Sequence, residues 1–169
     1  PMDPAVPTSP YLTELWSENV HIFTVPTWAP VMVGDVTILG FGHDRADITI
    51  NPFDTIEPPP GKGPVILMGP ARTAGVGDLD GEGRAVYAPE QTFPPNTAYV
   101  ALGGEPVAHP VAKPGGPEVW YPGELERGDF GQQGACHVLE VTIGTPAAGG
   151  APLAQVNQVP VSGGRFFAM

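Results

Sequence analysis

Cysteine and basic residues are scarce in this chain of 169 residues. Its one cysteine, Cys136, cannot form a disulfide within the chain, which excludes a small scaffold held together by cystines. Seven Lys and Arg against 18 Asp and Glu give a net charge of −11, and a field of that sign repels phosphate backbones. We therefore expect no direct binding of nucleic acid.

Long hydrophobic runs are missing as well. No stretch approaches the ~18 consecutive apolar residues that a membrane helix needs. The N-terminal stretch PMDPAVPTSPY has neither the basic residues nor the apolar run of a signal peptide. Only three serines and four asparagines are present, and few thermolabile side chains with proline-stiffened loops are typical of heat-adapted proteins. We expect a soluble protein, or a subunit of a soluble assembly, from a thermophilic source.

Glycine and proline are abundant, at 23 residues each, and 41% of the chain is hydrophobic. The hydrophobic residues fall in short β-branched runs between the glycines and prolines, which favours a folded all-β domain with rigid turns over a disordered chain. The expected strands span residues 18–25, 31–41, 46–50, 64–69, 83–88, 97–103, 117–121, 135–144 and 155–161. Gly34 and Asp35 stand between two apolar runs, as in a tight hairpin.

Two segments depart from the strand pattern. Residues 9–19, SPYLTELWSEN, indicate a helix of about two turns, with Ser9 as its cap, Pro10 at its first position, and Tyr11, Leu12, Leu15 and Trp16 on one face. The prolines of residues 106–114 forbid a central strand, so this segment should be an edge or polyproline-like connection.

The spacing of the expected strands favours a sandwich or barrel, because βαβ units would need amphipathic helices between the strands. We predict an antiparallel β-sandwich or barrel of jelly-roll type with extended arms at both ends. Residues 1–17 form an N-terminal arm with room for a short helix. Residues 18–161 form a single β-barrel domain, and residues 162–169 form an apolar tail.

The stretch DLDGEG at residues 78–83 resembles the start of the calcium loops of dockerins, EF-hands and integrins. Asp78, Asp80 and Glu82 take the first three ligand places, because alternate carboxylates in a glycine-kinked loop can converge on one ion. The ninth and twelfth loop positions are Val86 and Pro89, which supply no side-chain oxygen. We therefore interpret the stretch as a polar turn, with the three carboxylates as candidate calcium ligands, and expect no cofactor.

Other residue types that carry chemistry are dispersed. A cupin-type metal site usually places two histidines at alternate positions of one strand, and the sequence has no such pair among its histidines, which are His21, His43, His109 and His137. Cys136 precedes one of them directly, so on a strand their side chains point to opposite faces and cannot form a nucleophile and base pair.

Two further motifs read more simply as surface loops. Glu124, Glu126 and Asp129 cluster around Arg127, which indicates local charge balance and not the paired carboxylates of a glycoside hydrolase. GKG at residues 61–63 lacks the spacing of a phosphate-binding loop, so Lys62 should be a solvated loop tip.

The chain ends in Phe166, Phe167 and Met169, after a flexible Ser-Gly-Gly. Burying one such side chain is worth roughly 1.5–3 kcal/mol, so these residues should pack into the barrel or into a neighbouring subunit. The chain length, the strands of one barrel, the Pro/Gly-rich loops and the extended termini resemble the single-jelly-roll capsid proteins of viruses. They are most similar to the small major capsid protein of tailless, membrane-containing icosahedral phages of thermophilic bacteria.

That resemblance implies a virion shell subunit, made in the host cytoplasm, that associates with copies of itself and with a second coat protein. It also implies an internal viral membrane in the vicinity. Two alternatives remain open. One is a head-decoration protein of a tailed phage. The other is an enzyme or ligand-binding protein of cupin or calycin type, with a pocket lined by Trp28, Trp120, His21 and His137.

Overall fold

The computed structural model describes residues 6–43, 52–59, 61–70, 72–73, 86–87, 93–111, 115–125, 136–144 and 153–161. In chain order its elements are α1 (Pro10–Thr13), β1 (Trp28–Val33), β2 (Val36–Phe41), the 3₁₀ turn η1 (Pro52–Thr55), β3 (Val65–Pro70), β4 (Arg72–Thr73), β5 (Val86–Tyr87), β6 (Thr97–Gly103), β7 (His109–Pro110), β8 (Glu118–Tyr121), β9 (Cys136–Ile143) and β10 (Ala154–Val161). The described residues are therefore mainly in β-strands and contain almost no helix, as predicted. None of the helices in the described ranges is long and apolar enough to cross a membrane.

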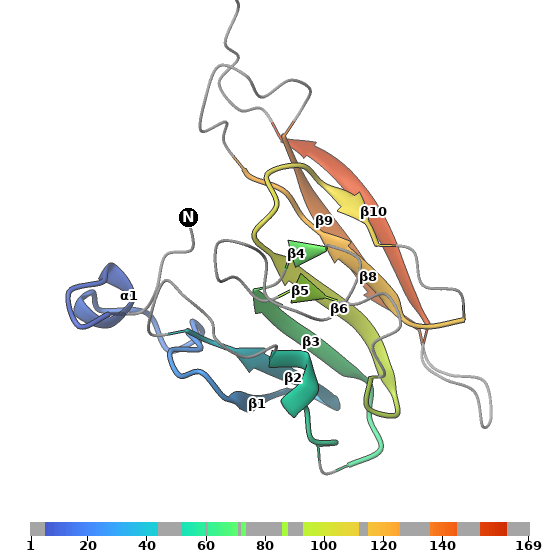
Figure 1. Cartoon of the computed structure of the whole chain (residues 1–169), viewed down its shortest axis with the longest axis horizontal. Helices are drawn as coiled ribbons and strands as arrows, with labels where there is room; N and C mark the ends of the chain where they lie inside the picture. The colour runs from blue at the N-terminus through green and yellow to red at the C-terminus, as the bar shows by residue number, and fades with distance from the viewer. Residues whose placement is uncertain are drawn as a thin grey trace, which may run out of the picture.

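The largest sheet has six strands in the order β1-β2-β3-β6-β8-β7, and Figure 1 shows its central strands side by side. The prediction of antiparallel strands is wrong for three neighbouring pairs, because β2 with β3, β3 with β6, and β6 with β8 are parallel. Parallel neighbours need a connection of about a dozen residues or more. The Pro/Gly-rich segments between these strands are long enough for such connections, and further strands are expected from the sequence at 46–50 and 83–88 within two of them.

One face of this sheet carries the core. Leu39, Leu67, Val100 and Val119 are register partners in a row across β2, β3, β6 and β8, and each is at most 4% exposed. In β3 and β8 the buried residues alternate with less buried neighbours, which is the two-residue period of a strand. Phe53 of η1 packs on the row. The core therefore lies between the sheet and the segment that contains η1.

Trp28 closes one side of this core at the start of β1. Its indole Nε1 donates a hydrogen bond of 2.7 Å to the carbonyl oxygen of Pro52, and its ring meets Phe41 and Phe53 edge to face. A buried indole needs such a partner for its N–H. The hydrogen bond ties the η1 segment to the edge of the sheet.

The N-terminal segment crosses the opposite face. The Phe23 ring lies directly over Gly40, and a Cβ at that position would overlap the ring. Gly42 likewise leaves room for the backbone of Phe23 and donates a hydrogen bond of 3.1 Å to the carbonyl oxygen of Val25. Gly40 in β2 and Gly42 just after it therefore allow close approach of residues 6–25, called the arm below.

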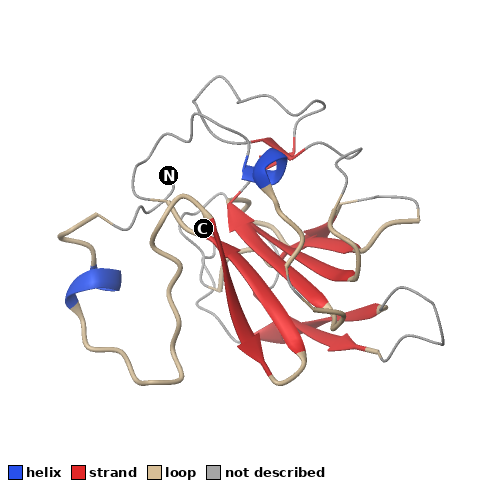
Figure 2. Ribbon diagram, turned by 90° about the horizontal axis from the view of Figure 1, so that it is seen from below, coloured by secondary structure: helices blue, strands red, loops and turns tan. Residues whose placement is uncertain are grey.

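Two predictions for the arm are wrong: the strand at residues 18–25 and the length of the helix. Residues 18–25 form no strand, because they run over the sheet face at Gly40 and find no ladder partner there. The helix is four residues long and ends at Thr13, since Glu14 has extended backbone with ψ 152°. Ser9 caps it as predicted, its Oγ accepting from the Tyr11 amide at 3.2 Å. Figure 2 shows α1 standing away from the strands.

Other predictions from the sequence are confirmed. Gly34 and Asp35 form the turn between β1 and β2, and Gly34 has φ 62°, a region that favours glycine. The segment 106–114 contains the edge strand β7, at the end of the sheet. β9 and β10 lie at the strands expected over residues 135–144 and 155–161, and they pair as an antiparallel hairpin beside β8. The division into arm, barrel domain and tail stays a prediction.

Candidate functional site

A polar groove lies where the β9–β10 hairpin meets β8. It has a volume of about 640 Å³. Six side chains from the three strands line it with polar or aromatic groups, together with Ala154 and Val156: Glu118, Trp120, Glu140, Thr142, Gln155 and Asn157. They are three pairs at positions i and i+2, which a strand places on the same face.

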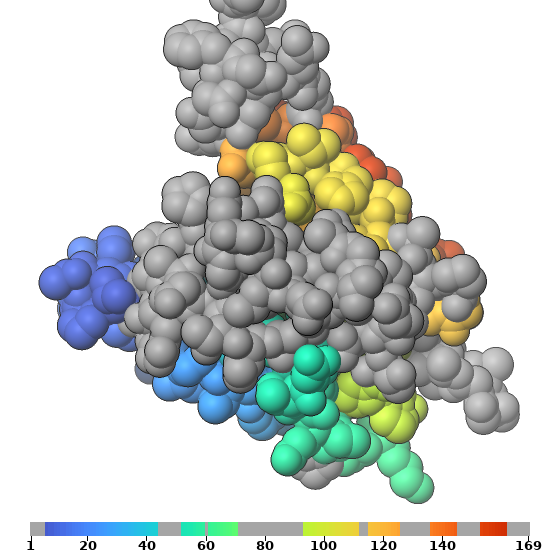
Figure 3. Space-filling view, in the orientation of Figure 1, coloured from blue at the N-terminus to red at the C-terminus, as the bar shows by residue number. Residues whose placement is uncertain are grey.

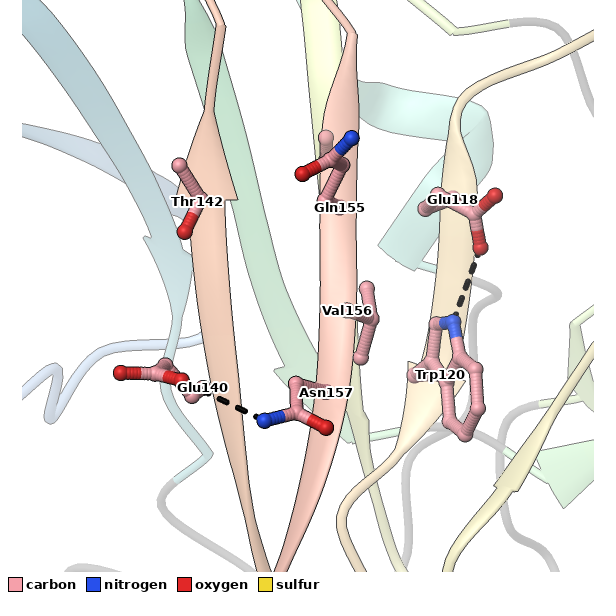
Figure 4. Close-up of a pocket in the computed structure, with 8 residues that line it drawn as sticks. Glu118, Trp120, Glu140, Thr142, Gln155, Val156 and Asn157 are labelled. Atoms are coloured by element: carbon pink, nitrogen blue, oxygen red, sulfur yellow. Dashed lines mark hydrogen bonds between the residues drawn. The ribbon is translucent and has the colours of Figure 1, made fainter.

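The register of the hairpin orders these side chains into two rows. Gln155 lies opposite Thr142, and Asn157 lies opposite Glu140. Figure 4 shows Glu118 and Trp120 of β8 beside β10, with Val156 toward Trp120 and Asn157 toward Glu140. The groove is therefore lined by six polar or aromatic side chains from three strands, which we call the grid.

Two hydrogen bonds within the grid fix its side chains. The Trp120 indole Nε1 donates to Glu118 Oε2 at 2.9 Å, and Asn157 Nδ2 donates to Glu140 Oε2 at 3.4 Å (Figure 4). The first bond is between residues two apart on β8 and sets the orientation of the indole. Both carboxylates keep lone pairs for further donors.

Tyr99 of β6 is the register partner of Glu118. Burial of its hydroxyl, reinforced by the charge of the Glu118 carboxylate, raises the pKa of Tyr99 from its ordinary value near 10 to about 12. Both effects disfavour the phenolate. The side chain is only 6% exposed, so the neutral phenol belongs to the packed sheet beneath the groove.

We predict a stability loss at alkaline pH that depends on Tyr99. Between pH 10 and pH 12 the unfolded chain releases the Tyr99 proton and the folded chain retains it, so the free energy of unfolding falls as pH rises. The slope from this one group is at most about 1.4 kcal/mol per pH unit. Denaturant titrations over this range should show a smaller fall for Tyr99→Phe than for the parent chain. Equal falls would assign the pH dependence to other groups.

A second hollow lies between the arm and the sheet. The arm contributes Trp16, His21 and Phe23 among others, and the sheet contributes Met68 and Leu102 among others. The lining is mainly apolar, and His21 meets Phe23 edge to face with ring centroids 4.7 Å apart. The hollow is the seam along which the arm packs on its own chain.

The candidate calcium ligands and the tail are not among the described residues. Asp78, Asp80 and Glu82 lie outside the described ranges, as do Phe166, Phe167 and Met169, and their roles stay predictions. Within the described ranges, no group of three or more His, Cys, Asp or Glu is placed to hold a metal ion. Lys62 is exposed, as expected of a loop tip.

The residues of the predicted cupin-like pocket do not come together. Trp28 packs in the core, Trp120 lines the polar groove, and His21 lines the hollow beside the arm. Cys136 and His137 are consecutive on β9, so their side chains point to opposite faces, as predicted.

Sequence reasoning missed the polar groove, although part of its signal is visible. Glu140 and Thr142 alternate with apolar residues on one expected strand, and Gln155 and Asn157 do so on another. The alternation marks a polar face, but nothing in it indicates that Trp120 lies beside the hairpin.

Comparison with protein-family models, with curated proteins and with solved structures finds no match to this chain.

Proposed function

We propose that this protein is a structural subunit of a virion shell, which associates through its arms with copies of itself and with a second coat protein. The arm, residues 6–25, is the feature that supports the proposal. Its helix α1 has no buried residue. Leu12 is 48% exposed, Trp16 is 49% exposed, and Leu15 is fully exposed.

Large apolar side chains gathered on one projecting segment indicate a contact with another molecule. Figure 3 shows the blue atoms of the arm as a projection at the edge of the molecule. Phe23 holds the base of this projection against Gly40, so the arm leaves the sheet at a fixed place. An arm that is anchored at its base and apolar beyond it suits docking on a neighbouring subunit.

The identity of the assembly is inferred from the resemblance of the whole chain to small capsid proteins of membrane-containing phages. A β-rich body with an N-terminal arm agrees with that resemblance, and so does the negative charge, which disfavours contact with packaged nucleic acid. The jelly-roll prediction fits the antiparallel β9–β10 hairpin but not the three parallel pairs of the large sheet. The proposal needs the arm and the β-rich body, and it does not depend on jelly-roll strand order.

Solution mass and electron microscopy of the intact chain test the proposal. Sedimentation over a range of concentrations should show oligomers, and images should show shells or sheets when a second coat protein is supplied. A chain that stays monomeric at high concentration would contradict the proposal. Binding only to the outside of preformed phage heads would instead identify a head-decoration protein.

A further inference from the structure

We propose that the polar groove between β8 and the β9–β10 hairpin binds a neutral saccharide. This inference is independent of the shell proposal. It rests on three properties of the groove: an oriented aromatic ring, a surrounding grid of hydrogen-bonding groups, and the absence of any cationic side chain from its lining.

The aromatic ring of the groove belongs to Trp120, which is half-buried. Its indole N–H is held by the 2.9 Å hydrogen bond to Glu118. Because this hydrogen bond keeps the indole in a defined orientation, a flat ligand can pack on the ring without the entropy cost of ordering the side chain. The C–H groups along one side of a sugar ring form such a flat apolar surface, which suits packing on an indole.

The hydrogen-bonding groups around the ring match the hydroxyl groups of a sugar. The Gln155 and Asn157 amides both donate and accept, the Thr142 hydroxyl does the same, and the Glu118 and Glu140 carboxylates accept. Because sugar hydroxyls are also donors and acceptors, every group of the grid can find a partner. The volume of about 640 Å³ lies within the usual range of small-ligand sites.

The charge of the groove lining disfavours anionic ligands. The lining contains two carboxylates and no Lys, Arg or His, and the chain carries a net charge of −11, so phosphates, sulfates and acidic glycans are repelled. A calcium ion takes six to eight oxygen ligands, whereas the lining offers two carboxylates, and the described residues include no group of three or more His, Cys, Asp or Glu placed to hold a metal ion. A neutral saccharide uses the aromatic ring, and a metal ion does not.

Calorimetric titration of the full chain tests the proposal, with cellohexaose, maltohexaose and chitohexaose as neutral probes. A heparin hexasaccharide and a lysine-rich peptide serve as charged probes. At least one neutral probe should bind saturably. Trp120→Ala should weaken that binding at least about fivefold, the factor that corresponds to the loss of one aromatic packing contact. Val107→Ser, which removes an exposed apolar side chain outside both the groove and the arm, should leave the affinity unchanged.

A double variant, Gln155→Ala with Asn157→Ala, gives an independent reading if Trp120→Ala does not fold, because both residues are exposed. It should also weaken binding of the neutral probe. The proposal is overturned if no neutral probe binds. It is also overturned if binding survives in the folded groove variants, or if only the heparin hexasaccharide or the peptide binds.

Discussion

Changing Leu12, Leu15 and Trp16 together to serine should abolish self-association while leaving the sheet folded. The three side chains are about half to fully exposed in the single chain, so their loss removes little packing within it. In an assembly each would bury apolar surface worth roughly 1.5–3 kcal/mol. Losing all three should weaken association on the order of a thousandfold or more. Sedimentation of parent and variant across the same concentration range measures this shift.

A matched control removes exposed apolar residues that lie outside the arm. Val107 is 62% exposed and Leu153 is 74% exposed, and both belong to the described body of the protein. The double variant Val107→Ser with Leu153→Ser should associate like the parent chain. If this control dissociates as strongly as the arm variant, association depends on general surface hydrophobicity and the arm has no special role.

Leu67→Ala should lower the free energy of unfolding by about 2–5 kcal/mol. Leu67 is 0% exposed and stands between Leu39 and Val100 in the row that crosses the parallel strands. The variant loses the transfer free energy of the leucine side chain and leaves a cavity, because the strands on either side cannot close over it. Chemical denaturation of both chains, monitored by circular dichroism, measures the difference.

Met68→Ala is the matched control, because it truncates a large apolar side chain on the face of the sheet opposite the core. Met68 follows Leu67 on β3, points to the opposite face and is 41% exposed, so its truncation should cost less than about 1.5 kcal/mol. Equal losses for the two variants would show that both faces are packed alike, contrary to the arrangement of the sheet.

The strands themselves could be predicted from the sequence, but their order could not. The run TAYVALG at 97–103 and the turn at Gly34 and Asp35 carry local signals, namely β-branched runs between breakers and a glycine at a turn. Strand direction depends on how long connections travel through space, and that information is not local. The parallel pairs of β3 therefore escaped prediction.

The arm and the groove illustrate the same limit. Residues 18–25 alternate as a strand would, yet Phe23 lies on Gly40 because two glycines farther along the chain open room for its ring and backbone. The groove needs Trp120 beside β10, a contact between elements far apart in sequence. The chemistry of each side chain could be predicted from its position in the sequence. Which side chains lie together in space depends on the fold and could not be predicted.

The parallel order of β2, β3, β6 and β8 has a consequence for how the chain folds. Each parallel pair can form only after a long connection has been synthesised and closed. These connections are residues 42–64, 71–96 and 104–117. Closing such loops costs entropy before any ladder hydrogen bond forms, and sheets built this way fold in roughly milliseconds to seconds. The row from Leu39 to Val119 cannot close until synthesis has passed Tyr121, so the sheet assembles only when most of the chain has left the ribosome. Until then its strand edges are open to pairing with other nascent copies, and the yield of folded protein should depend on how fast the chain is made.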